Sequence, residues 1–233
     1  MLEGKVVKGI KELIEELKQE NHIVNQIIRD DVFGILQTCN CTVLYYPLYG
    51  EDGEGEGCDG CHLEKMIAGK MEQMVFINSN NTRERQAFST AHELGHIWKA
   101  DERLRSMFPE IELDTEEVIN RFAAELLMPE EYFNDVIEEY LKKNRISGAN
   151  HEAYRYVRAN CVSDELFFVP YRSVVKRMIE LKRLQHQDED MLVPFKNSEH
   201  LAEIIKAEQY TRLHHIDKTK SMDDLPGGME IYF

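Results

Sequence analysis

Apolar residues recur along much of this chain at the spacing of one face of an α-helix. The predicted helices cover residues 1–20, 23–36, 82–98, 114–128, 130–143 and 170–181. The second is expected to bend near Gly34, the third to begin at Asn81 or Thr82, and the fourth to stop at Pro129. The first carries its apolar residues on one face between Lys and Glu, which is typical of an amphipathic helix and not of a signal peptide.

Strand patterns are fewer and fall between the second and third predicted helices. Residues 41–46 are β-branched and aromatic, which favours a strand. Two short apolar runs, 66–68 and 74–77, predict a hairpin, and the acidic, Gly-rich segment 50–60 predicts a loop. We therefore predict an α+β fold that is mostly helical, with a small sheet next to the helix over 82–98.

The chain after Gln185 is acidic and irregular, with one short amphipathic candidate around Leu201, Ile204 and Ile205. This change in composition predicts a main domain over 1–187 and an acidic tail over 188–233.

The composition limits the classes of partner. A formal net charge of -15 disfavours direct binding to nucleic acid. It suits a basic protein partner, or it only keeps the protein soluble. No apolar run is long enough to span a bilayer, and five cysteines without a signal peptide predict reduced thiols in the cytoplasm.

One short motif carries metal chemistry. In His92-Glu93-Leu94-Gly95-His96 the two histidines are four residues apart, so on a helix both rings project from one face and can reach a tetrahedral zinc. Glu93 is placed to accept a proton from a metal-bound water. Gly95 permits close approach of neighbouring backbone.

A catalytic zinc needs a third protein ligand, and several carboxylates could supply it. The candidates are Glu112, Glu116, Glu117 and Glu125. Glu116 shares a helix face with Asn120, which could hydrogen-bond a ligand histidine or orient the carboxylate. The residues alone leave the choice among the four open.

Three stretches together resemble the ImmA/IrrE-type metallopeptidases, which are HExxH zincins with a downstream Glu ligand. They are Val75-Phe76-Ile77-Asn78, Arg83 to His96, and Asn120-Arg121-Phe122-Ala123-Ala124-Glu125-Leu126-Leu127-Met128-Pro129, with a weaker block over 169–178. The resemblance covers roughly residues 40–182 and implies a thermolysin-like minimal zincin domain.

The resemblance implies a zinc endopeptidase with Glu93 as catalytic base and His92, His96 and Glu116 as the metal ligands. Glu125 then becomes a surface or packing residue. Known members include peptidases that cut helix-turn-helix repressors of mobile elements or stress genes, so a basic repressor is the expected substrate. We further expect an edge strand over 74–78 to hold an extended substrate. The candidates for oxyanion binding are Tyr45, Tyr46, Tyr132 and His151.

The sequence also allows two other functions and a second metal site. A zinc-containing regulator could sequester a repressor without cutting it, although such a protein would not need Glu93. A helix-turn-helix DNA binder over 150–184 would use the basic residues Arg172, Lys176, Arg177, Lys182 and Arg183. Cysteines could also form a second, structural zinc site, through Cys39, Cys41, Cys58 and Cys61.

Overall fold

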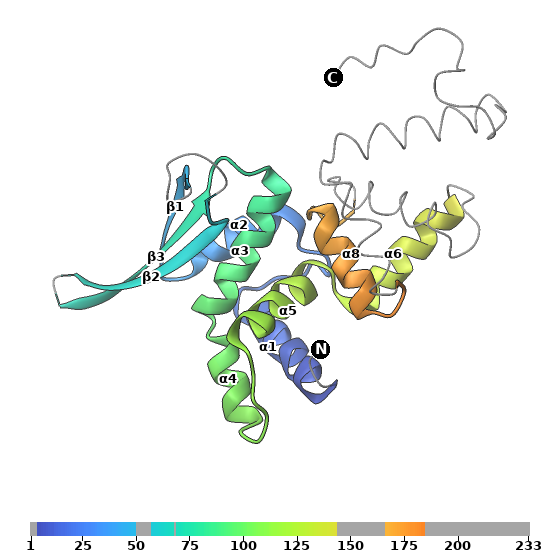
Figure 1. Cartoon of the computed structure of the whole chain (residues 1–233), viewed down its shortest axis with the longest axis horizontal. Coiled ribbons are helices and arrows are strands. Elements are labelled where there is room, and N and C mark those ends of the chain that lie inside the picture. The colour runs from blue at the N-terminus through green and yellow to red at the C-terminus, as the bar shows by residue number, and fades with distance from the viewer. Residues whose placement is uncertain (1–3, 50–56, 68, 144–165, 185–233) are drawn as a thin grey trace, which may run out of the picture.

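The computed structural model describes residues 4–49, 57–67, 69–143 and 166–184, and it is an α+β structure (Figure 1). Its helices are α1 (Gly4–Glu20), a 3-10 helix (Arg29–Asp31), α2 (Val32–Thr38), α3 (Arg83–Ile97), α4 (Ala100–Met107), α5 (Thr115–Leu127), α6 (Glu130–Lys143) and α8 (Tyr171–Glu180). They pack beside one small sheet, so the predicted fold class is confirmed. The predicted domain boundary at 187 and the helix around Leu201 lie outside the described residues.

The sheet has three strands, β1 (Thr42–Tyr46), β2 (Gly60–Ile67) and β3 (Lys70–Asn78), in the order β1-β3-β2. β1 runs parallel to β3 and β2 runs antiparallel to it. The predicted strand over 41–46 and the hairpin are confirmed, but the expectation that 74–78 forms an edge is wrong. β3 pairs on both sides, and the edges of the sheet are β1 and β2.

The β2–β3 ladder is longer than its apolar runs because polar cross-strand pairs extend it. Glu64 lies opposite Gln73, whose side chain donates a hydrogen bond to the Glu64 carboxylate at 3.0 Å, and Lys65 lies opposite Glu72. Such pairs stabilise an exposed ladder without an apolar pattern. The hairpin therefore projects beyond the helices (Figure 1), while Val75 and Ile77 at its base are fully buried.

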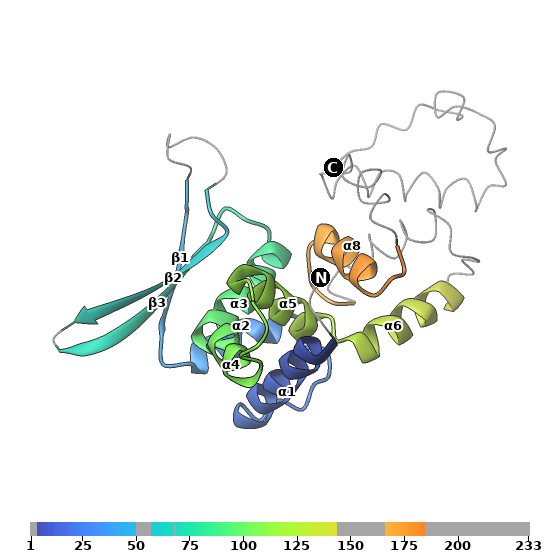
Figure 2. The same ribbon diagram turned by 60° about the horizontal axis from the view of Figure 1, so that its bottom comes forward.

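α1 covers the helical layer from below, as Figure 2 shows, and buries the predicted face. The buried apolar residues are Val6, Ile10, Leu13, Ile14 and Leu17. At Gly9 a Cβ would lie 2.7 Å from the Leu104 side chain of α4, so the absence of a side chain lets these two helices approach. α4 was not predicted, because its single turn-spaced apolar pair, Ala100 and Leu104, stands among charged residues.

The predicted helix over 23–36 is wrong in its first half. Residues 23–28 are irregular, and helix begins only with the 3-10 turn at Arg29 and continues as α2 without a break at Gly34. His22 and Arg29 have positive φ angles, which interrupt a right-handed helix. Ile28 still reaches the core, whereas Val24 is 91% exposed, so the apolar spacing in this segment reflects no helical face.

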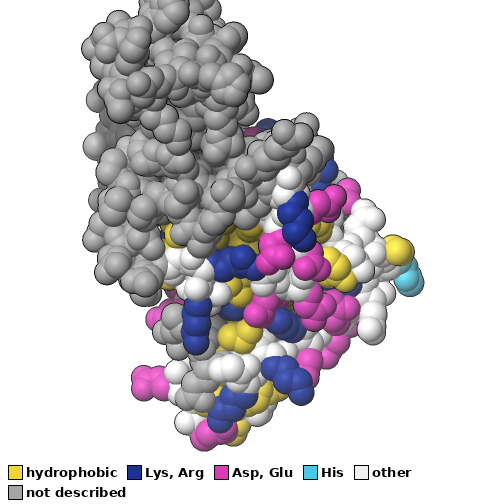
Figure 3. Space-filling model, turned by 90° about the vertical axis from the view of Figure 1, so that its right-hand side faces the viewer, with side chains coloured by type: hydrophobic (Ala, Val, Ile, Leu, Met, Phe, Trp, Pro, Cys, Tyr) yellow, Lys and Arg dark blue, Asp and Glu magenta, His cyan; other side chains and the backbone are white. Residues whose placement is uncertain are grey.

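α8 is fixed to the rest of the structure through a buried arginine. Arg177 is fully buried, its Nε donates to the Met128 carbonyl at 3.0 Å, and its Nη2 contacts the buried Glu125 carboxylate at 2.5 Å. Arg177 therefore cannot belong to an exposed DNA-reading face. Where described side chains are visible on the face in Figure 3, acidic and basic groups are interspersed and do not form a basic patch. Within the described residues 166–184, the interpretation of this region as a helix-turn-helix DNA binder is not supported.

Candidate metal centre

Two helices supply the polar residues of the site. α3 begins at Thr82, whose hydroxyl accepts a hydrogen bond from the Arg85 amide, and this N-cap is one of the two predicted. α5 begins at Asp114, whose carboxylate accepts from the Glu117 amide at 2.7 Å. Both caps fix where the helices start, and therefore which residues of each face the other.

His92 and His96 of α3 and Glu116 of α5 point their ligand atoms at one another. Nε2 of His92 lies 3.2 Å from Nε2 of His96. The Glu116 carboxylate lies 3.5 Å from His92 Nε2 through one oxygen and 3.8 Å from His96 Nε2 through the other. Ligand atoms about 2.0–2.2 Å from a tetrahedral zinc are separated by ~3.3 Å, so these distances fit a shared ion.

The structure thus separates Glu116 from its rivals. His92, His96 and Glu116 form the group within the described residues whose ligand atoms, all within 4.8 Å of one another, could hold a metal ion. Glu112, Glu117 and Glu125 are outside that group. Glu125 is a buried packing residue, since its carboxylate pairs with Arg177 and accepts the Glu130 amide at 3.0 Å.

Asn120 contacts the first histidine, which is one of the two roles that its spacing allowed. His92 Nδ1 donates to the Asn120 side-chain oxygen over 3.2 Å. This bond places the proton on Nδ1 and leaves the lone pair of Nε2 free to face Glu116 and His96. Asn120 lies one helical turn after Glu116, so one face of α5 positions both the carboxylate and the ring.

Burial favours the metal-binding form of both rings. Desolvation is the main cause that lowers the pKa of His92 and of His96, and for His96 the neighbouring His92 lowers it further. The nearby Glu116 carboxylate opposes this shift in both. A ring with a lowered pKa is neutral at physiological pH, and neutral imidazole is the form that binds a metal.

Glu93 lies between the two histidines on α3 and turns toward the sheet. Its side chain is only 4% exposed, and burial, followed by the negative charge of Glu116, raises the pKa of its carboxyl to about 7. A Cβ added to Gly60, the first residue of β2, would lie 3.0 Å from the Glu93 carboxylate. The edge strand therefore runs directly beside this carboxyl group.

His62, which the sequence pattern did not single out, lies two residues further along β2 on the same face as Gly60. It is half-buried, and its Nε2 is buried without a hydrogen-bond partner in the described residues. Burial lowers the pKa of His62, and His96 and Lys99 contribute, which places it near the end of α3. Alternation along β2 would have pointed to His62 had the strand been predicted to start at Gly60.

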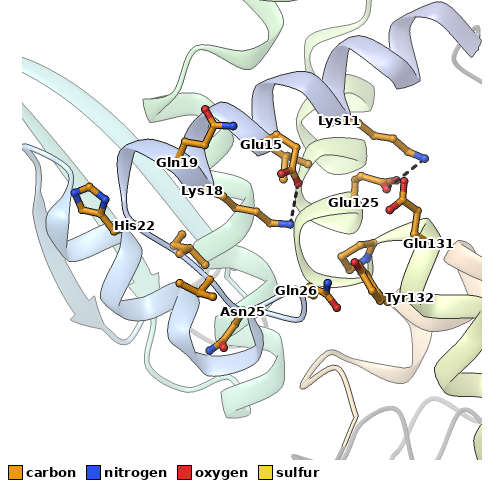
Figure 4. Close-up of a pocket in the computed structure, with 14 residues that line it drawn as sticks. Lys11, Glu15, Lys18, Gln19, His22, Asn25, Gln26, Glu125, Glu131 and Tyr132 are labelled. Atoms are coloured by element: carbon orange, nitrogen blue, oxygen red, sulfur yellow. Dashed lines mark hydrogen bonds and ion pairs between the residues drawn. The ribbon is translucent and has the colours of Figure 1, made fainter.

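Among the described residues, no hydrogen bond or ring contact joins the candidate tyrosines for oxyanion binding to the metal centre. Tyr45 interacts with Arg83, which lies about 2.5 turns before His92 on α3, and Tyr46 is 60% exposed. Tyr132 instead lines a cleft of about 580 Å³ between α1 and the start of α6 (Figure 4). His151 lies outside the described residues.

The four cysteines named for a second zinc site do not converge. No metal-holding group of the described residues includes Cys39, Cys41, Cys58 or Cys61, and all four are free thiols. Cys39 and Cys41 pack against the core after α2, whereas Cys58 and Cys61 lie at the start of β2. The predicted alternative of a structural zinc site is therefore wrong.

The family is settled by a comparison with known domains. A family model described as the IrrE N-terminal-like domain matches residues 39–158, slightly more than half of the chain. The chain belongs to this family. It is an ImmA/IrrE metallopeptidase, and as a peptidase it acts on a protein substrate.

The matched range of this metallopeptidase contains all of the metal centre and ends before α8, so the weaker resemblance over 169–178 lies beyond it. No curated protein matches the chain. Every helix among the described residues is too short or too polar to traverse a bilayer.

Proposed function

We propose that this metallopeptidase is a zinc-dependent endopeptidase in which His92, His96 and Glu116 bind the metal and Glu93 is the catalytic base. The observation that carries the proposal is the convergence of both histidine Nε2 atoms with the Glu116 carboxylate beside the buried Glu93. Two imidazoles and one carboxylate are a ligand set of catalytic zinc, and they leave a fourth position open. Zinc in such a site acidifies water and polarises a carbonyl group.

Glu93 has the properties that proton transfer requires. A base works best when its pKa lies near the operating pH, and in the metal-free protein burial raises the pKa of the Glu93 carboxyl to about 7. The positive charge of a bound zinc would lower this pKa and favour the carboxylate that accepts the proton. In the proposed reaction Glu93 takes a proton from the attacking water and later gives it to the leaving amine. Its burial under Gly60 keeps bulk water from competing for the carboxylate.

The edge strand β2 supports an extended substrate. Within the described residues β2 pairs only with β3, so its outer edge has free backbone groups, and its first residue touches Glu93. A peptide added to this edge would pass the base in extended form. This assigns to β2 the role that the sequence had suggested for residues 74–78.

We propose a basic helix-turn-helix repressor as the substrate. The support is the family resemblance together with the net charge of -15, which favours encounter with a basic protein. The site of action is proposed to be the cytoplasm, in keeping with free thiols at Cys39, Cys41, Cys58 and Cys61.

Cleavage can be tested by incubating the zinc-loaded protein with the repressor encoded beside its gene and measuring product masses. We expect one discrete cut, and a loss of about 10²–10⁴-fold in rate for Glu93→Gln. A stable complex that yields no cut would contradict the endopeptidase and support a regulator that sequesters the repressor.

Metal binding is tested separately by competition with a zinc chelator. Glu116→Gln is expected to weaken zinc binding by more than ~100-fold, because loss of a mere hydrogen-bond partner of a ligand already weakens it about 10–100-fold. Glu117→Gln, one position further on the same helix, is the matched control and should bind zinc as the natural chain does. Equal affinities of the two variants would contradict Glu116 as a ligand.

A further inference from the structure

A pair of cysteines stands at the point where β2 reaches the metal centre. Cys58 and Cys61 are separated by Asp59 and Gly60, the C-x-x-C spacing of many dithiol sites. Cys58 is exposed, Cys61 is half-buried, and both are free thiols. Burial, and then the charges of Cys58 and Glu93, raise the pKa of the Cys61 thiol, so Cys58 lies close enough to influence it. The two thiols therefore neighbour each other at the start of β2.

The backbone around this pair is tied to the sheet and to α3. The Asn78 side chain donates to the Cys58 carbonyl at 3.0 Å, and the Asn78 amide donates to the Asp59 carbonyl at 3.0 Å. The Asp59 carboxylate accepts from the Asn81 side chain at 2.8 Å and pairs with Arg85 at 2.9 Å. These contacts hold the segment in its bend at Asp59, between the two cysteines, so little chain entropy opposes a bond between their sulfurs.

The same segment touches the proposed base. A Cβ at Gly60 would stand 3.0 Å from the Glu93 carboxylate and 3.2 Å from the Phe76 carbonyl, so its backbone is confined between them. Gly60 lies inside the four-residue ring that a bond between the sulfurs would close. A shift of its backbone cannot be absorbed without moving Glu93 or the β2–β3 ladder.

We propose that Cys58 and Cys61 form a reversible disulfide with a small-molecule disulfide of the glutathione type as oxidant, and that the disulfide lowers the activity of the neighbouring peptidase site. The second half rests on the proposed function. The first half, a redox modification site, stands on the placement of the two thiols alone.

The exchange balances in two steps. The Cys58 thiolate, the accessible one, attacks a sulfur of glutathione disulfide, giving a mixed disulfide and releasing one glutathione thiolate. The Cys61 thiolate then attacks the Cys58 sulfur and releases the second glutathione. Both protein thiols are oxidised, one glutathione disulfide is reduced to two glutathiones, and the two thiol protons end on the released glutathiones.

The physical consequence follows from the change in sulfur separation. The sulfurs of two separate thiols must approach to about 2.05 Å when the bond forms. Since Asn78, Asn81 and Arg85 restrain the outer part of the segment, the movement falls on Gly60 and Cys61. Gly60 lies beside Glu93, so a shift of its backbone would displace the carboxylate from its position between the histidines and the free edge of β2.

The test equilibrates the full-length, zinc-loaded protein in glutathione buffers from fully reduced to fully oxidised. Free thiols are then blocked by alkylation, and the Cys58–Cys61 peptide is weighed by mass spectrometry. We expect an intramolecular disulfide in oxidising buffers, a fall of at least ~10-fold in cleavage rate, and recovery of both with dithiothreitol. Cys58→Ser and Cys61→Ser should remove the redox response, whereas Cys39→Ser with Cys41→Ser should retain it.

The two halves fail in different ways. If Cys58 and Cys61 remain alkylatable in fully oxidised glutathione, or carry only mixed disulfides, the modification site is wrong whatever the peptidase does. If the disulfide forms and the protein still cleaves its substrate as fast as the protein with free thiols does, the proposed coupling to Glu93 is wrong. A protein that forms the disulfide but cuts no substrate in either state counts against the proposed function and leaves the disulfide established.

Discussion

Gly95 of α3 and Phe122 of α5 lie so close that a Cβ on Gly95 would stand 3.1 Å from the Phe122 ring. Two atoms of Ile119 would be only 3.3 Å away. The motif residue between Glu93 and His96 therefore contributes a close helix contact, and this contact brings Glu116 within reach of both histidines. The geometry of the metal centre depends on a residue that has no side chain.

We predict that Gly95→Ala lowers both stability and zinc affinity. Phe122 and Ile119 are fully buried, so they cannot move aside, and overpacking of this kind costs about 1–3 kcal/mol, offset in part by about 1 kcal/mol from the better helix former. Urea unfolding and chelator competition measure the two effects. Gly34→Ala in α2 is the matched control, because the added Cβ would meet nothing within 4 Å. This substitution should therefore stabilise the helix. An equally stable, equally zinc-binding Gly95→Ala protein would contradict the contact's importance.

A second prediction concerns the hydrogen bond between Asn120 and His92. Asn120→Ala removes the acceptor of the His92 Nδ1 proton, so the ring loses its fixed tautomer and orientation. We expect zinc affinity to fall about 10–100-fold with little change in the fold. Asn120→Asp keeps an acceptor oxygen and should retain most of the affinity. Unchanged zinc affinity in Asn120→Ala would contradict the role of this hydrogen bond in orienting His92.

How far the sequence predicts this site depends on the distance along the chain. His92, Glu93 and His96 share one helix, so their spacing alone brings them together. Glu116 lies on another helix, and the residues alone left four carboxylates open. Only the resemblance favoured Glu116, because sequence spacing does not reveal the Gly95 contact that sets the separation of α3 and α5.

The two segments that the sequence predicted wrongly differ from the prediction for physical reasons as well. Residues 23–28 carry helically spaced apolar residues, yet positive φ angles at His22 and Arg29 keep them out of a helix. The sequence predicted only the apolar end of β2. Its first residues, Gly60 to His62, belong to the strand because they pair with β3 and contact α3. That error also hid His62 and the edge position of β2. Tertiary contact overrode the local pattern in both segments.

The buried charge pair between α5 and α8 leads to a third prediction. Arg177→Met leaves the Glu125 carboxylate buried without its closest partner, and we expect a loss of about 3–5 kcal/mol in the free energy of unfolding. Combining Arg177→Met with Glu125→Gln should recover part of that loss, since no buried charge then lacks its partner. Lys5→Met, which breaks an exposed pair with Glu110, is the control and should leave the stability almost unchanged. A small effect of Arg177→Met alone would contradict the anchoring of α8 by this pair.

The last prediction uses the half-buried thiol of Cys39. Burial, and then the neighbouring Cys41, raises the pKa of this thiol from 9.0 to about 11. Alkylation requires the thiolate, which makes up only ~0.1% of a thiol with that pKa at pH 8, against ~10% for a pKa of 9.0. The rate of Cys39 alkylation by iodoacetamide should therefore rise about tenfold per pH unit up to about pH 11, while exposed Cys58 reacts first at pH 8. Peptide mass spectrometry over a pH series measures both rates. A Cys39 rate that levels off near pH 9 would mean that the thiol is solvated as in an unfolded chain, and that the segment after α2 does not pack against the core.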